Sequence, residues 1–234
     1  MKIIAHRGAS AVRPENTLAA FEEAIRIGVD AIELDLHQTR DGRLVALHDD
    51  LVRLDGDWRY VGELSFDELQ RLDVGAGEHV PSLDLVLEQV RARCPLVLEI
   101  KAFGLAGPLS AVLRRHGLGT DLHVTSFLHE EVVEVGRQCP GLARSITLAA
   151  VPIRFQTLLE DSGTAEVSLF RGYLNREITA RLRAHGATVR AYPVNLPREA
   201  ALMAEWGVDA IYTDDPAAMQ SLRESSRGSQ SPPE

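Results

Sequence analysis

The stretch GVDAIELDL, residues 28–36, contains the two patterns that decide the fold. Its glycine ends a helical stretch, and the apolar residues that follow are typical of a short buried strand. The pentapeptide GVDAI occurs again at residues 207–211, where it also follows a helical stretch and begins a strand. We interpret this echo as one loop structure that is used twice in a repetitive fold.

Short apolar strands and amphipathic helical stretches alternate along the whole chain. The clearest helix is ENTLAAFEEAIRIG, in which Leu18, Phe21 and Ile25 recur at helical spacing; Asn16 is expected to cap its start, and Gly28 its end. Strands are expected at residues 3–6, 31–36, 96–101, 122–126, 143–147, 165–170, 188–192 and 209–213. These strand–helix units predict a (β/α)8 TIM barrel rather than a doubly wound open sheet, for which no GxGxxG motif is present.

One segment interrupts the alternation after the second strand. The sequence DLHQTRDGRLVALHDD predicts a strand, a turn at Asp41 and Gly42, and a short return strand. A small insertion of irregular and helical chain is then expected at about residues 49–81. A single barrel domain covers residues 1–224, and the Ser- and Pro-rich sequence of residues 225–234 predicts a disordered tail.

The bulk composition restricts the partners and the location. With a net charge of −9, nucleic acid and anionic membrane surfaces are expected to be poor partners. No apolar run approaches the 18 residues of a membrane span, and the N-terminal apolar run is only three residues long, so we expect a cytoplasmic protein without stable membrane insertion. Cys94 and Cys139 fit no metal-binding spacing and are expected to be buried thiols rather than a disulfide.

Three carboxylates are expected at the carboxyl ends of the strands, where barrel active sites lie. Glu33 and Asp35 share one face of the second strand, and Glu99 and Lys101 share one face of the third. Burying three acids together is costly without a cation, and oxygen ligands suit a hard divalent ion such as Mg²⁺ or Ca²⁺. A salt-bridge network with Arg7 and Lys101 would also neutralise them, and the pattern alone leaves both interpretations open.

Two histidines are expected at the same mouth. His6 ends the first strand and precedes Arg7, while His48 ends the return strand of the hairpin. One histidine could take a proton from a nucleophile and the other give one to a leaving alcohol, while Arg7 and Lys101 hold a phosphate. Glu15 either holds Arg7 or faces the dipole of the first helix. The sequence leaves open the roles of the histidines at 37, 79 and 129.

The ordered motifs resemble those of the glycerophosphodiester phosphodiesterase family. They are AHRGAS, PENTLAAF, GVDAIELDLHQTRDGRLVALHD, VPSLDLVLEQV, LVLEIK, TSF and GVDAIYTDDP, and the resemblance extends from residue 3 to about residue 216. It implies a TIM barrel with an insertion after strand two. It also implies one divalent metal ion, Mg²⁺ or Ca²⁺, and hydrolysis of glycerophosphodiesters to sn-glycerol 3-phosphate and an alcohol. The matching motifs imply that His6 and His48 are the acid–base pair. They also imply that the metal ligands are Glu33, Asp35 and Glu99, and that Arg7 and Lys101 contact the phosphate.

Two departures from the family pattern affect the substrate pocket. The family's WTVN is replaced by YPVN, with Tyr192 and Pro193, and the insertion lacks the usual Thr-rich, Gly-rich stretch after the histidine. The alternatives are a related barrel phospholipase that acts on intact phospholipid, and a catalytically silent barrel that binds glycerophosphodiesters. The preferred metal and head group, the identity of the base and the oligomeric state stay open.

Overall fold

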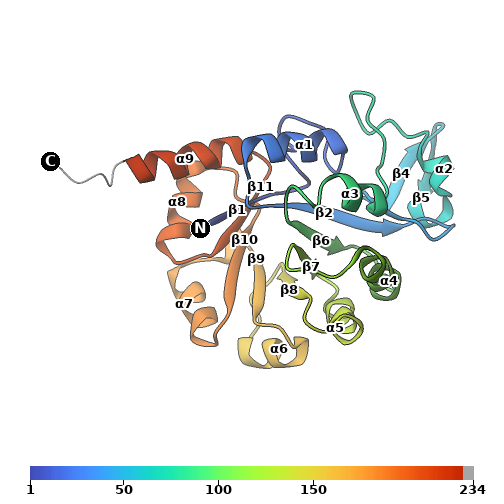
Figure 1. Cartoon of the computed structure of the whole chain (residues 1–234). Helices are drawn as coiled ribbons and strands as arrows, with labels where there is room; N and C mark the ends of the chain where they lie inside the picture. Colours follow the sequence, from blue (N-terminus) through green and yellow to red (C-terminus); the bar gives the residue numbers. More distant parts are fainter. Residues whose placement is uncertain (229–234) are drawn as a thin grey trace.

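The structure, a computed structural model, describes the backbone of residues 1–228. Within that part of the chain, parallel strands close a barrel in the order β1, β2, β6, β7, β8, β9, β10, β11, and β11 pairs with β1 (Figure 1). Their bounds are β1 (Lys2–Ala5), β2 (Ala31–Gln38), β6 (Leu96–Ile100), β7 (Leu122–Ser126), β8 (Ala143–Leu148), β9 (Glu166–Phe170), β10 (Thr188–Tyr192) and β11 (Ala210–Thr213). The predicted TIM barrel is confirmed.

Helices surround the barrel because the outward face of the strands is apolar (Figure 1). Leu34 and Leu36 of β2 are fully buried in the cluster between strands and helices, together with Phe21 of the first helix. The helices around the barrel are α1 (Leu18–Ile27), α3 (Leu83–Gln89), α4 (Ala106–His116), α5 (His129–Gln138), α6 (Phe155–Ser162), α7 (Arg176–Ala184), α8 (Pro197–Glu205) and α9 (Pro216–Gly228). The single-turn 3-10 helix η2 (Arg171–Tyr173) follows β9.

The two GVDAI segments form the same local structure. Gly28 and Gly207 have φ values of 82° and 84°, in the left-handed region where glycine is favoured. Asp30 and Asp209 each accept a backbone N–H at 2.8 Å from a neighbouring strand, β1 and β10 respectively. The repeated sequence is therefore one loop structure used twice.

The insertion is a small structured unit beside β2 (Figure 1). Strand β3 (Leu44–Ala46) pairs antiparallel with β2 through the turn at Gly42, as predicted from the sequence. The insertion then contains the hairpin of β4 (Leu51–Leu54) and β5 (Asp57–Tyr60), the 3-10 helix η1 (Val61–Glu63) and the short helix α2 (Phe66–Leu69). These elements pack around an apolar cluster of their own.

The start of α1 differs from the prediction. Thr17, rather than Asn16, is the N-cap residue, and its side-chain oxygen accepts the N–H of Ala20 at 3.2 Å. Asn16 has a φ of 58°, which asparagine tolerates better than most residues, and its side chain turns into the barrel. Gly28 ends the helix as predicted.

The C-terminal helix extends beyond the expected domain boundary at residue 224. Helix α9 continues to Gly228, and residues 229–234 of the predicted tail lie outside the described residues. Arg223 of α9 binds Asp30 at 2.7 Å, and Gln220 donates to the carbonyl of Gly28. These contacts hold the helix against the first GVDAI loop. Within residues 1–228, no helix is both long and apolar enough to cross a bilayer.

Candidate active site

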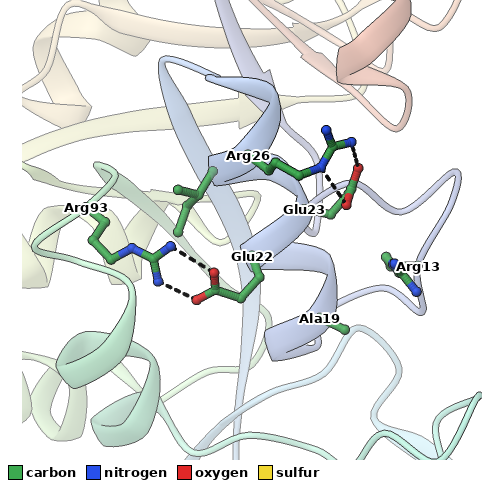
Figure 2. A pocket seen from close by; sticks show the side chains of 7 residues that line it. Arg13, Ala19, Glu22, Glu23, Arg26 and Arg93 are labelled. Carbon is green, nitrogen blue, oxygen red and sulfur yellow. Dashed lines mark hydrogen bonds and ion pairs between the residues drawn. The ribbon is translucent and has the colours of Figure 1, made fainter.

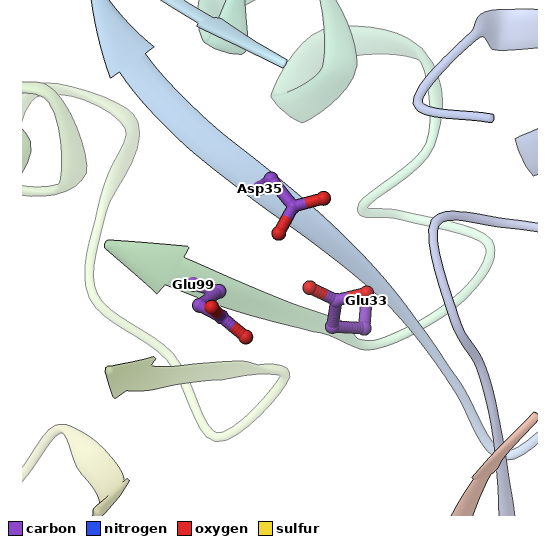
Figure 3. A group of neighbouring side chains, drawn as sticks. All are labelled: Glu33, Asp35 and Glu99. Carbon is purple, nitrogen blue, oxygen red and sulfur yellow. The ribbon is translucent and has the colours of Figure 1, made fainter. Parts of the chain in front are cut away.

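Three buried carboxylates meet inside the mouth of the barrel. Glu33 and Asp35 project from β2 and Glu99 from β6, where Asp35 and Glu99 are register partners (Figure 3). One carboxylate oxygen from each residue lies within 4.8 Å of the others, and the three residues are 1%, 1% and 8% exposed. The acids therefore lie together, as the alternation of inward-facing and outward-facing residues along each strand predicted.

Two cations contact this acidic cluster. The guanidinium Nε of Arg7 lies 3.1 Å from Asp35 Oδ2. The Lys101 Nζ lies 2.8 Å from Glu99 Oε1 and 3.3 Å from Asp35 Oδ1. The backbone N–H of Arg7 also donates to Glu33 Oε2 at 2.9 Å. The salt bridges that the sequence suggested are thus present in the structure. However, the cluster has only two cations for three carboxylates.

The remaining negative charge fits a bound metal ion. Burial raises the pKa of Glu33 well above its usual range, and the charges of Asp35 and Glu99 raise it further. Among the described residues, Glu33 Oε1 and Asp35 Oδ1 are buried without a hydrogen-bond partner. These two oxygens, of which Asp35 Oδ1 has only the ion pair with Lys101 Nζ at 3.3 Å, lie beside a third acid and form the type of donor set that a hard divalent cation takes. The cluster can therefore hold a metal ion.

His6 is oriented by a carboxylate from the far end of the chain. Its Nδ1 lies 2.7 Å from Oδ1 of Asp214, which follows β11. Burial works to raise the pKa of Asp214, but the hydrogen bonds with His6 and Asn195 outweigh it and lower the pKa. An ionised Asp214 favours the tautomer of His6 with a proton on Nδ1, which leaves Nε2 for proton transfer. His6 also lines a small pocket with Glu99 and Tyr192.

His48 has the same type of partner. Its Nδ1 lies 2.7 Å from Oδ1 of Asp49. The N–H of Leu47 donates to the carbonyl of Asp35 at 3.0 Å, which ties the end of the hairpin to β2 beside the acids. Burial works to raise the pKa of Asp35, but the charges of Lys101 and Arg7 outweigh it and lower the pKa. The hairpin therefore brings His48 to the same mouth as the acids.

The structure also shows how the neighbouring residues hold this arrangement. Glu15 binds the Arg7 guanidinium at 3.0 and 2.9 Å, so of the two alternatives it holds Arg7. Asn16 donates to Asp35 Oδ2 at 2.8 Å and accepts the backbone N–H of Asp35 at 3.1 Å. Sequence reasoning missed Asp214 as a partner of His6 and assigned Asn16 to the helix start, although both lie in motifs that carried the family resemblance.

Three of the other histidines contact backbone carbonyls. His37 is buried and lies 3.1 Å from the carbonyl of His48, so it supports the loop that carries this residue. His79 and His129 contact the carbonyls of Leu72 and Thr147. His123 lies low in the barrel beside Arg190.

A surface depression on the outer side of α1 is separate from the mouth. Figure 2 shows its charged side chains, in which Glu22 pairs with Arg93 and Glu23 with Arg26. Because these charges neutralise one another outside the barrel, the depression is not part of the site.

The sequence profile of the glycerophosphoryl diester phosphodiesterase family matches residues 6–103 and 113–218. The chain belongs to this family. Among similar proteins, YhdW of Bacillus subtilis is 32% identical, with 92% of this chain and 95% of that protein covered. The glycerophosphodiester phosphodiesterase of Caldanaerobacter subterraneus is 30% identical, with 94% and 96% covered. The resemblance identified from the motifs is confirmed.

Solved structures agree with this membership of the glycerophosphoryl diester phosphodiesterase family. An Oleispira antarctica phosphodiesterase, solved in complex with the product sn-glycerol-3-phosphate, has a TM-score of 0.89 and 29% identity, with 96% of this chain and 97% of that chain covered. A glycerophosphodiester phosphodiesterase from Agrobacterium tumefaciens has a TM-score of 0.83 and 28% identity, with 94% and 99% covered.

Proposed function

We propose that the chain hydrolyses glycerophosphodiesters to sn-glycerol 3-phosphate and an alcohol, with one divalent ion, Mg²⁺ or Ca²⁺. The observation that carries this proposal is the joint placement of His6–Asp214 and His48–Asp49 around three buried acids. Each pair joins a proton carrier to a carboxylate that orients it. The small-molecule product bound by the Oleispira relative supports the same substrate class.

The acidic residues would hold the metal ion, and the cations would hold the phosphate. Glu33, Asp35 and Glu99 supply the oxygen ligands, and the bound ion would neutralise charge that develops on the phosphate. Once this charge compensates the acids, Arg7 and Lys101 can pair with phosphate oxygens. Both side chains are 18% exposed, so they remain within reach of a ligand at the mouth.

The two histidines divide the proton transfers. One takes a proton from the attacking oxygen, which belongs to water or to a glycerol hydroxyl, as that oxygen bonds to phosphorus. Attack by water gives sn-glycerol 3-phosphate directly, whereas attack by the hydroxyl gives a cyclic phosphodiester that water must then open to give the same product. The other donates a proton to the alcohol oxygen as its bond to phosphorus breaks. Asp214 holds His6 in one tautomer, and Asp49 does the same for His48.

A diester with a nitrophenol leaving group identifies the acid, because nitrophenolate departs without a proton. Replacing the histidine that acts as the acid should lower kcat little with this substrate and strongly with glycerophosphocholine. Replacing the histidine that acts as the base should lower kcat equally with both substrates. If His6→Asn and His48→Asn lose activity equally on both substrates, this division of roles is wrong.

The experiment that tests the function is hydrolysis of several glycerophosphodiesters by the purified protein. The rate is measured after chelation and after Mg²⁺, Ca²⁺ or Mn²⁺ is restored. We expect sn-glycerol 3-phosphate to form only with a divalent ion. Tight binding of glycerophosphocholine without turnover in the presence of each ion would instead support the silent binding protein.

A further inference from the structure

One side of the barrel mouth carries exposed apolar side chains. The loops after five successive strands, β6 to β10, each present at least one large apolar residue to solvent. We call this set the apolar crescent: Phe103, Phe127, Val151, Ile153, Tyr173 and Leu196. Ile153 is 94% exposed and Phe103 is 70% exposed, so these side chains do not serve the core.

Two residues of the crescent, Phe127 and Tyr173, are linked by aromatic contacts to the candidate active site. Tyr192 lines the same small pocket as Glu99, and its ring meets Phe127 edge-on with centroids 5.7 Å apart. Phe170 lies 6.1 Å from the Tyr192 ring and 5.5 Å from the Tyr173 ring. Aromatic contacts therefore lead from the acidic cluster to the rim.

The opposite side of the mouth carries the charged residues of the candidate site, although the segments after β1 and β2 also expose Val12, Trp58 and Tyr60. There the loop after β1 carries the ion pair of Arg7 and Glu15, and the hairpin after β2 carries His48 and Asp49. Lys101 marks the boundary, because its Nζ contacts the acids and also lies 5.8 Å from the centre of the Phe127 ring. A substrate that spans the mouth would meet charged groups at one end and apolar groups at the other.

We propose that the apolar crescent binds an alkyl or acyl chain of the substrate, so that the preferred substrates are glycerophosphodiesters that carry one long apolar chain. This inference rests on the proposed function, and it changes neither the bond that breaks nor the groups that move protons. Clustered exposed apolar residues mark binding surfaces in soluble proteins, and this cluster adjoins the pocket where the phosphate would lie.

The test is a series of glycerophosphodiesters whose alcohol lengthens from ethyl to octyl, assayed below the concentration at which they aggregate. A fully buried methylene changes binding about four-fold, and we expect about two-fold for one on an open rim. The six added methylenes should then raise kcat/KM about 60-fold. A second series places the chain on the first carbon of glycerol in a glycerophosphocholine, and identifies which end of the substrate the crescent covers.

Variants assign the effect to the crescent. The double variant Ile153→Ser, Phe103→Ser should lower the octyl-to-ethyl ratio of kcat/KM by at least about five-fold. Because the readout is a ratio on one preparation, partial loss of folded protein does not affect it. Leu202→Ser removes a 44% exposed leucine from α8 and is the matched control, for which the ratio should not change.

Other outcomes would overturn the inference. If neither series responds to chain length while the ethyl diester is hydrolysed, the crescent does not bind a chain and the proposed function stands. If no diester is hydrolysed with metal present, the proposed function itself fails. A rise that begins only at aggregation would show capture at a lipid surface. Dimers that dissociate in Ile153→Asp, measured by sedimentation, would assign the crescent to a second copy of the chain.

Discussion

Asn16 provides the sharpest test of how the acidic cluster is held. The residue is 2% exposed, and its side-chain amide bonds to both the carboxylate and the backbone N–H of Asp35. We predict that Asn16→Ala lowers the free energy of unfolding and weakens metal binding, because it leaves both groups of Asp35 without this partner.

The magnitude follows from three contributions. A hydrogen bond to a charged group contributes about 1.5–3 kcal/mol, and a neutral one about 0.5–1.5 kcal/mol. Asn16 has a φ of 58°, and alanine in the left-handed region costs about 1 kcal/mol. Asn16→Ala should therefore lower the free energy of unfolding by about 3–5.5 kcal/mol. Asn16→Gly removes the same bonds without the backbone strain, and should cost about 1 kcal/mol less than Asn16→Ala.

The assay is urea denaturation followed by circular dichroism, with a Mg²⁺ titration of activity on the folded protein. Loss of a residue that orients a metal ligand should weaken apparent metal affinity about 10–100-fold. An Asn16→Ala protein within about 0.5 kcal/mol of the parent, with unchanged metal affinity, would refute the reasoning. If the glycine variant is no more stable than the alanine variant, the strain contribution is wrong.

Three further predictions concern pH, metal and catalysis. Burial lowers the pKa of His123 in the folded protein well below 6.5. As the pH falls below about 6.5, the unfolded chain therefore binds the proton before the folded protein does. The free energy of unfolding should then decrease by up to about 1.4 kcal/mol per pH unit. Urea titrations should show a weaker decline in His123→Asn; parallel declines would contradict this. Saturating Mg²⁺ or Ca²⁺, at about 100 times its Kd, should stabilise the protein by about 2.7 kcal/mol in thermal unfolding and have little effect on Glu33→Gln; equal stabilisation of both would argue against the site. Asp214→Asn should lower kcat about 10²–10⁴-fold with little change in KM, since it frees the tautomer of His6, and an unchanged kcat would remove Asp214 from the mechanism.

Much of the barrel could be predicted because its signals are local. Each strand is a short apolar run, and the predicted strands agree with the observed ones to within two residues at each end. The inward direction of Glu33, Asp35 and Glu99 follows from alternation along single strands, which a sequence displays directly.

Long-range partners could not be predicted in the same way. His6 and Asp214 are 208 residues apart, and they meet only because β11 closes the barrel against β1. Asn16 was assigned by its propensity for helix starts, but the next residue, Thr17, takes that role, and the buried carboxylate of Asp35 attracts the amide. Closure of the barrel and burial of the carboxylate determine these contacts, and a local sequence pattern predicts neither.

The apolar crescent also depends on tertiary structure. Its residues lie in separate loops, where single apolar residues carry little information about exposure. Only the closed barrel brings the carboxyl ends of β6 to β10 together along one side of the mouth, where the loops that carry Phe103 and Ile153 follow β6 and β8.

The central claim is that two histidines and a metal ion held by the three acids hydrolyse a glycerophosphodiester. It is tested most directly by the kcat for glycerophosphocholine, measured with saturating divalent ion in the parent protein, His6→Asn and His48→Asn, and again after chelation. The account predicts turnover in the parent that stops on chelation and returns with the ion, and a loss of about 10²–10⁴-fold in each variant. Turnover that persists without metal, or at the parent rate in either variant, would contradict it.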